Sequence, residues 1–171
     1  MECFPVDVRT NPRFSDSFDP RPGGHRGTDI FAPRGSVVLA VEEGDARTEQ
    51  DPKGGTVIYL QAKSGAKYYY AHLDTLIDRF PRHVYEGDGI GTVGTTGNAQ
   101  GTDPHLHFQM WLPSLGLVNP YHELERVAAL DHDADEVSEG NEEEGDGLSE
   151  TGRGLLIAAL LLAWGLWWAL T

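Results

Sequence analysis

The sequence is poor in cysteine and in basic residues. Its 171 residues include a single cysteine, Cys3, which excludes an intramolecular disulfide and a zinc site built from several cysteines. Lysine and arginine number 13 against 27 aspartate and glutamate, so the formal net charge is −14. The basic residues are scattered singly rather than clustered, which argues against a nucleic acid as partner. No stretch near Met1 combines a basic start with an apolar run, so no signal peptide is expected.

Long helical periodicity is also scarce before the last part of the chain. Short apolar runs separated by glycine and proline instead predict strands at residues 37–41, 56–62, 66–73, 90–93 and 106–112. Lys63-Ser64-Gly65 between two of these runs is typical of a hairpin, and a short helix is expected near residues 121–130. We therefore predict a mainly β domain over residues 1–126, an antiparallel β-sandwich or barrel, with Gly-rich loops at 43–54 and 94–103.

Two further segments differ from this domain in composition. Residues 127–153 are rich in glutamate and glycine and offer little to bury, so we predict an acidic, flexible linker. Residues 154–171 carry no charge, and as a helix they would extend about 27 Å, close to the ~30 Å hydrocarbon core of a bilayer. A buried helix of the globular domain is the alternative, but we predict a single-pass C-terminal transmembrane anchor with the lipid bilayer as partner.

The placement of the histidines carries most of the chemical information. His25 and Asp29 are four residues apart, and His105 and His107 are two apart, spacings that keep side chains on one face of a strand. His72 lies in an alternating run in which it would share a face with the tyrosines at 68 and 70. Zinc favours imidazole and carboxylate ligands, and catalytic sites use three of them with a position left for water. Two histidines and one aspartate would meet that requirement, but spacing alone does not say which histidines. For His83, His122 and His132, at other places in the chain, we expect no role in the site.

Three segments together resemble a known family. Residues 25–29 (HRGTD), 70–73 (YAHL) and 101–108 (GTDPHLHF) resemble the signature motifs of the lysostaphin-type zinc metallopeptidases, the peptidoglycan endopeptidase family with the duplicated hybrid motif fold. The order and intervals fit as well, and the similarity extends over roughly residues 4–121. The resemblance implies that His25, Asp29 and His107 bind zinc, and that His72 and His105 act on water or the transition state.

We therefore expect a zinc-dependent metalloendopeptidase that hydrolyses peptide bonds of peptidoglycan cross-links or bridges by metal-activated water. No His-Glu-x-x-His motif supplies a glutamate base, so an imidazole must take the proton. We assign His105 as the base and His72 as the stabilising group, and these two roles are exchangeable.

Two other functions compete with this expectation. One is a catalytically silent family member that acts as a cell-wall binding or hydrolase-activator module, and the other is a membrane-tethered protein whose histidines only store zinc. The presence of all five site residues favours the enzyme. Because peptidoglycan lies outside the cytoplasm, we expect the catalytic domain on the periplasmic or extracellular side of the membrane.

Overall fold

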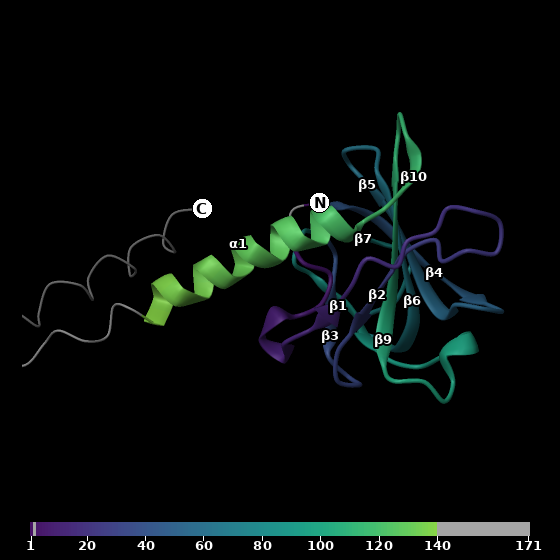
Figure 1. Ribbon diagram of the computed structural model, residues 1–171, viewed down its shortest axis with the longest axis horizontal. Helices are drawn as coiled ribbons and strands as arrows, with labels where there is room; N and C mark the ends of the chain where they lie inside the picture. Colours follow the sequence, from purple (N-terminus) through teal and green to yellow (C-terminus); the bar gives the residue numbers. More distant parts are fainter. Residues whose placement is uncertain (2, 140–171) are drawn as a thin grey trace, which may run out of the picture. The chain divides into compact units, whose positions relative to one another are not determined.

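The fold is an antiparallel β-sheet domain that continues into one α-helix (Figure 1). The computed structural model describes residues 1 and 3–139. The elements are η1 (Val8–Thr10), β1 (Arg13–Phe14), β2 (Thr28–Phe31), β3 (Val37–Leu39), β4 (Gly44–Asp51), β5 (Gly55–Ala62), β6 (Lys67–Leu76), β7 (Arg82–Val84), β8 (Gly89–Val93), η2 (Gly97–Ala99), β9 (His105–Leu112), β10 (Gly116–Val118) and α1 (Tyr121–Glu139). The prediction of a mainly β, antiparallel domain is confirmed.

The ten strands form one connected sheet with the order β1-β2-β9-β6-β5-β4-β7. Strand β10 pairs with β9, and β8 joins the sheet through β6 and carries β3 on its other side. The predicted hairpin is present as β5 and β6, in which Gln61 pairs with Lys67. Strand β9 lies between β2 and β6, so the segments that hold the predicted site residues are neighbours in the sheet although they are far apart in the sequence.

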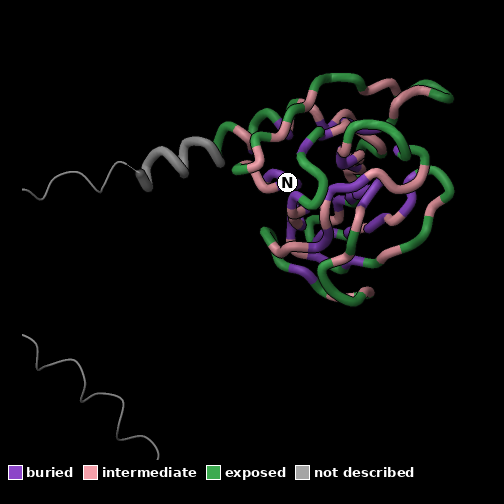
Figure 2. Tube along the Cα trace, turned by 90° about the horizontal axis from the view of Figure 1, so that it is seen from below, coloured by how far each residue is buried: buried purple, intermediate pink, exposed green. Residues whose placement is uncertain are grey.

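The main hydrophobic core lies on one face of the central strands. Alternate residues of β9, Leu106 and Phe108, are fully buried there, and Ile30 of β2 joins them. Figure 2 shows the buried residues gathered in the interior of the domain and the exposed residues mostly along its outside. Because strand side chains alternate between faces, the residues between these core positions point to the opposite face, where the candidate site lies.

Strand β4 corrects the prediction of a loop over residues 43–54. The segment is polar, but its small residues Gly44 and Ala46 are buried while Asp45 and Arg47 are exposed. The strand is held by pairing on both sides, to β5 along its whole length and to β7 at its start. This segment therefore forms a strand through backbone pairing and small buried side chains, although its sequence contains few large apolar residues.

Helix α1 extends further than the short helix predicted near residues 121–130. Leu124 and Val127 on its first turns are fully buried in the main core, so the helix crosses the boundary predicted at residue 126. It runs through residues 127–139, which the composition had assigned to the linker. The start of α1 lies beside the N-terminus, where Arg126 Nη2 donates to the Met1 carbonyl at 2.8 Å.

The remainder of the predicted linker and the predicted membrane anchor at 154–171 lie outside the described residues. Among the residues that are described, no helix combines the length and the apolar character needed to cross a bilayer.

Glu42 is a buried carboxylate at the edge of the core. Its oxygens accept hydrogen bonds from Ser64 Oγ at 2.6 Å and from the Tyr68 hydroxyl, and the Met1 amino group lies 2.8 Å away. Burial raises the pKa of Glu42, but the hydrogen bonds from the amino group, Ser64 and Tyr68 outweigh it and hold the pKa below its usual range. The ionised form of Glu42 is therefore part of the folded state.

Candidate metal centre

Asp29 and His107 face each other across neighbouring strands. Asp29 on β2 is the direct partner of His107 on β9, and His107 Nδ1 lies 2.7 Å from Asp29 Oδ1. Their strand neighbours, Ile30 and Phe108, point into the core, so alternation places Asp29 and His107 on the opposite face. The sheet register alone therefore brings a carboxylate and an imidazole together.

His25 reaches the same place from the segment before β2 rather than from a strand, which corrects the expectation that it shares a strand face with Asp29. Its Nε2 lies 3.1 Å from Asp29 Oδ1 and 3.0 Å from His107 Nδ1, and its Nδ1 lies 2.9 Å from Ser17 Oγ. The segment passes against β9 at Gly27, where a Cβ atom would lie 2.4 Å from the Phe108 carbonyl oxygen. A residue without a side chain at position 27 thus allows His25 to approach the sheet.

The three residues His25, Asp29 and His107 form a compact donor set. One ligand atom from each lies within 4.8 Å of the others, and the chemistry of two imidazoles and one carboxylate fits a zinc ion. Burial raises the pKa of Asp29, but hydrogen bonds from His107 and His25 outweigh it and leave the pKa far below its usual range. Hydrogen bonding to Asp29 in turn raises the pKa of His25. The carboxylate is thus ionised at any physiological pH, as a metal ligand must be.

His72 enters the site through a break in the alternation of β6. Tyr70 pairs with Ile58 and Leu73 pairs with Thr56, so β6 has two residues, Ala71 and His72, where β5 has one. His72 takes a positive φ of 65° at this bulge. The bulge therefore places Ala71 and His72 both in the pocket lining, and Leu73 directly after it joins the core. This corrects the predicted alternation, in which His72 shared a face with the tyrosines at 68 and 70.

His72 and His105 are held in similar ways. His72 Nδ1 donates to the Thr96 carbonyl at 2.9 Å, and His105 Nδ1 donates to the Asp103 carbonyl at 2.8 Å. Because a carbonyl only accepts, each neutral ring carries its proton on Nδ1 and keeps Nε2 as the basic atom. The ring centroids lie 4.9 Å apart, and burial lowers the pKa of His72. The pair thus offers, beside the donor set, two imidazoles whose Nε2 atoms are held by no backbone carbonyl of the described residues.

Gln109 is a site residue that the sequence analysis missed. Its side-chain amide lies 2.8 Å from His107 Nε2, the ring nitrogen that faces away from Asp29. It stands two residues after His107 on β9, so the same alternation that paired His105 with His107 could have revealed it. Ser17, which contacts His25, carries no such signal because it comes from an irregular segment.

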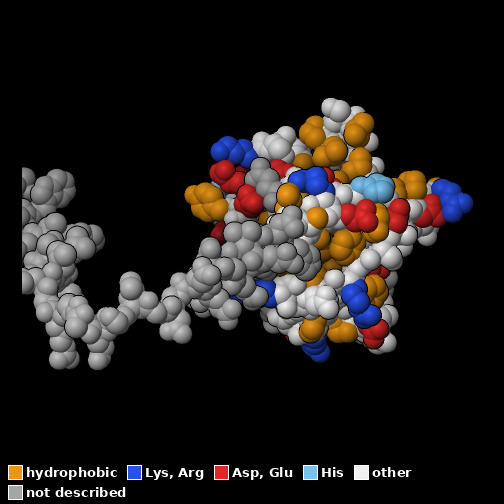
Figure 3. All heavy atoms as spheres, turned by 60° about the vertical axis from the view of Figure 1, so that its left-hand side comes forward, with side chains coloured by type: hydrophobic (Ala, Val, Ile, Leu, Met, Phe, Trp, Pro, Cys, Tyr) orange, Lys and Arg blue, Asp and Glu red, His pale blue; other side chains and the backbone are white. Residues whose placement is uncertain are grey.

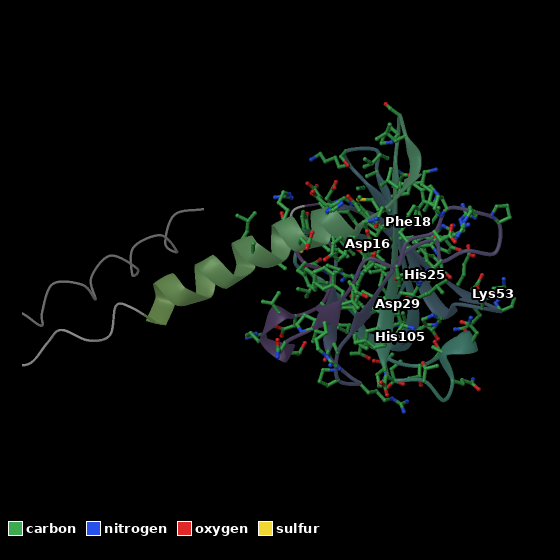
Figure 4. All side chains as sticks on the ribbon, in the orientation of Figure 1. Asp16, Phe18, His25, Asp29, Lys53 and His105 are labelled. Carbon is green, nitrogen blue, oxygen red and sulfur yellow. The ribbon has the colours of Figure 1, made fainter. Side chains whose placement is uncertain are left out.

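One pocket of about 660 Å³ lies on the sheet face opposite the core and is lined by His25, Asp29, His72, His105, His107 and Gln109. Its floor includes aromatic side chains of three strands, Tyr59, Tyr69 and Trp111. Figure 4 shows His25, Asp29 and His105 grouped at β2 and β9, with Lys53 to one side on the turn between β4 and β5. His83 and His122 do not line this pocket, and the side chain of His132 is outside the described residues.

One wall of the pocket consists of two loops joined to each other. Asn98 N donates to the Lys53 carbonyl at 2.8 Å, and Thr56 N donates to Thr96 Oγ1 at 3.0 Å. Gly97 has a φ of 68°, and a Cβ atom there would lie 2.1 Å from the Lys53 carbonyl oxygen, so the two loops meet at backbone distance. The Thr96 carbonyl that holds His72 belongs to this wall.

The donor set, the paired imidazoles and the pocket together are typical of a catalytic metal centre on a β-sheet. Comparison with known proteins identifies the family. Residues 23–120 match Peptidase family M23, and the chain belongs to this family. The resemblance to lysostaphin-type peptidases stated from the sequence is therefore confirmed.

Individual relatives agree with this assignment. The peptidoglycan DD-endopeptidase ShyC of Vibrio cholerae is 31% identical over 135 residues, which cover 74% of this chain and 29% of that protein. The catalytic domain of the antimicrobial peptidase lysostaphin from Staphylococcus simulans matches with a TM-score of 0.59 and 27% identity, over 70% of this chain and 98% of that chain. A zinc-containing peptidase from Vibrio cholerae matches with a TM-score of 0.58 and 28% identity, over 68% of this chain and 38% of that chain. The matched segments make up less than a third of the ShyC sequence, so this chain corresponds to one part of that relative.

Proposed function

We propose that this chain is a zinc-dependent endopeptidase that hydrolyses peptide bonds in the cross-links or bridges of peptidoglycan. The observation that carries the proposal is the convergence of five side chains from separate motifs in one pocket: His25, Asp29, His72, His105 and His107. The names of the relatives support the reaction and the substrate, because ShyC is a peptidoglycan endopeptidase and M23 is a peptidase family.

His25, Asp29 and His107 would hold the zinc ion. Zinc in such a site lowers the pKa of a coordinated water to about 7 and polarises the scissile carbonyl. The protein supplies the orientation of the ligands: Ser17 contacts the outer nitrogen of His25, and Gln109 contacts the outer nitrogen of His107. Such contacts fix the ring orientation of a metal-binding histidine.

His105 and His72 would handle the proton and the developing charge. With Nδ1–H of each ring fixed to a backbone carbonyl, Nε2 of His105 is available to accept a proton from water and return it to the leaving amine. Because Nδ1–H of His72 is held by the Thr96 carbonyl, His72 would stabilise charge on the carbonyl oxygen through Nε2 only after Nε2 has taken up a proton, and burial, which lowers the pKa of His72, favours the release of that proton afterwards. The geometry is equally compatible with the exchanged roles.

The alternative is a silent wall-binding or activator module. This alternative is not favoured, because all five side chains are present and converge in one pocket. For the membrane, we propose that residues 154–171 anchor the protein and that the domain faces the cell wall. The support for this proposal is the uncharged apolar run and the location of the substrate.

Zinc content and turnover on purified peptidoglycan test the proposal together. We expect one zinc per full-length chain and release of cleaved peptides. His25→Ala, Asp29→Ala and His107→Ala should each lose the metal and the activity. Full zinc occupancy in the His107→Ala protein would contradict the ligand assignment, and a zinc-loaded wild type that is inactive on every wall type would favour the activator module.

A further inference from the structure

The pocket contains two basic side chains that are not neutralised by the protein. Most described lysines and arginines form ion pairs, which involve Arg9, Arg21, Arg34, Arg47, Lys63, Arg82 and Arg126. On the face drawn in Figure 3, several basic side chains lie beside acidic ones. Arg26 and Lys53 line the pocket, and neither has a carboxylate within ion-pair distance among residues 1 and 3–139. The net charge of the chain is −14, and yet these two basic residues at the site have no acidic partner among the described residues.

The carboxylates that line the pocket are engaged elsewhere. Asp29 is bonded to His25 and His107. Asp51 Oδ1 accepts hydrogen bonds from the backbone N–H groups of Lys53 at 2.8 Å and Gly54 at 2.6 Å, which close the turn between β4 and β5. The side chains of Arg26 and Lys53 are therefore available to a ligand.

The pocket also continues along the sheet. A second cavity of about 580 Å³ shares Tyr59 and Trp111 with the first, and Lys67 lies in its lining. Lys67 likewise has no ion-pair partner in the part of the chain that the structure describes. A ligand longer than one residue could thus lie over the aromatic side chains and reach Lys67, while the carboxylate in this second lining, Asp45, lies 2.9 Å from His83 Nδ1.

We infer that the site selects peptides that carry free carboxylates near the scissile amide, bound by Arg26 and Lys53, over uncharged peptides such as glycine bridges. This inference rests on the proposed peptidase function. A guanidinium or ammonium group binds a carboxylate through a charge-assisted hydrogen bond, which is stronger than a neutral one. An uncharged bridge would leave both basic groups without a partner, and the unpaired cations would add nothing to its binding.

Two cross-link peptides of identical sequence provide the test, one with free side-chain and terminal carboxylates and one with the same groups as carboxamides. We expect the zinc-loaded full-length protein to cleave the carboxylate form with a kcat/KM roughly 5- to 30-fold higher, the effect of one to two good polar contacts. Lys53→Gln and Arg26→Gln should each reduce this preference by lowering kcat/KM for the carboxylate form only. Lys53→Arg and Arg26→Lys should retain it, and raised ionic strength should weaken it.

Arg79→Gln is the matched control, because Arg79 is exposed, has no described ion-pair partner and does not line the pocket. It should leave the preference unchanged. Equal kcat/KM values for both peptides in the wild type, or equal losses on both peptides in the Gln variants, would overturn the inference. If neither peptide were cleaved, the proposed function would fail instead. Calorimetric binding of the two intact peptides would then still decide whether carboxylates are preferred.

Discussion

The contact between Gln109 and His107 gives a prediction about metal affinity. In the Gln109→Leu protein, His107 Nε2 would lose its partner at 2.8 Å, and the His107 side chain is only 13% exposed, so water is a poor replacement. Loss of a buried hydrogen bond costs about 0.5–1.5 kcal/mol, and partners of metal-binding histidines typically contribute about 10- to 100-fold in metal affinity. We expect zinc to bind about tenfold more weakly to Gln109→Leu, which corresponds to about 1.4 kcal/mol.

Competition with a chromophoric chelator measures this change directly, without reference to activity. With the metal on Nδ1, His107 carries its proton on Nε2, and Gln109→Glu supplies a carboxylate oxygen that accepts from this ring N–H, so it should retain affinity close to that of the wild type. Gln50→Leu is the matched control, because Gln50 is exposed and contacts Thr56 instead of the metal centre. The reasoning is refuted if Gln109→Leu binds zinc as tightly as the wild type, or if Gln50→Leu weakens binding equally.

Four further predictions concern catalysis, stability and location. His72→Ala and His105→Ala should retain zinc by elemental analysis and reduce turnover of peptidoglycan by about 10²- to 10⁴-fold, and wild-type turnover in either would remove that residue from catalysis. Phe108→Ala should lower the free energy of unfolding by about 3–5 kcal/mol in denaturant titrations, since Phe108 is fully buried; a loss below 1 kcal/mol would contradict this. Because the folded-state pKa of Glu42 is lowered, its contribution to stability should be present above its ordinary pKa and decline as the pH falls toward the folded value. Glu42→Gln should flatten this acid limb, and an unchanged limb would argue against the assignment. Finally, we expect the full-length protein to fractionate with membranes through residues 154–171 and its domain to be released by protease from intact spheroplasts; a soluble full-length protein would exclude the anchor.

The sequence predicts those parts of the structure that depend on local alternation. The hairpin of β5 and β6 follows from two apolar runs around Lys63-Ser64-Gly65, and the common face of Asp29 and His107 follows once both are placed on strands. Strand β4 was missed because its pairing is made by the backbone and by small buried residues, which leave little hydropathy signal.

Other parts of the site depend on contacts that no local pattern records. His72 lies on the pocket face because of a bulge, and the extra residue becomes visible only when β6 is paired with β5. His25 lies outside the strand on which spacing would place it, and its position depends on the close approach of Gly27 to β9. The family resemblance, rather than spacing, separated His107 from His105 as a ligand.

The joined wall of the pocket has a consequence for protein engineering. The turn that presents Lys53 and the loop that contains Thr96 and Gly97 meet through backbone groups, and the same loop fixes the His72 ring. If the turn that contains Lys53 were replaced by one of different length or sequence, the loop that contains Thr96 would therefore move. The His72 imidazole, which this loop holds, would move with it. Substrate range in this scaffold should accordingly be redesigned by exchanging residues 51–56 and 94–98 as a single cassette, with both halves taken from the same donor.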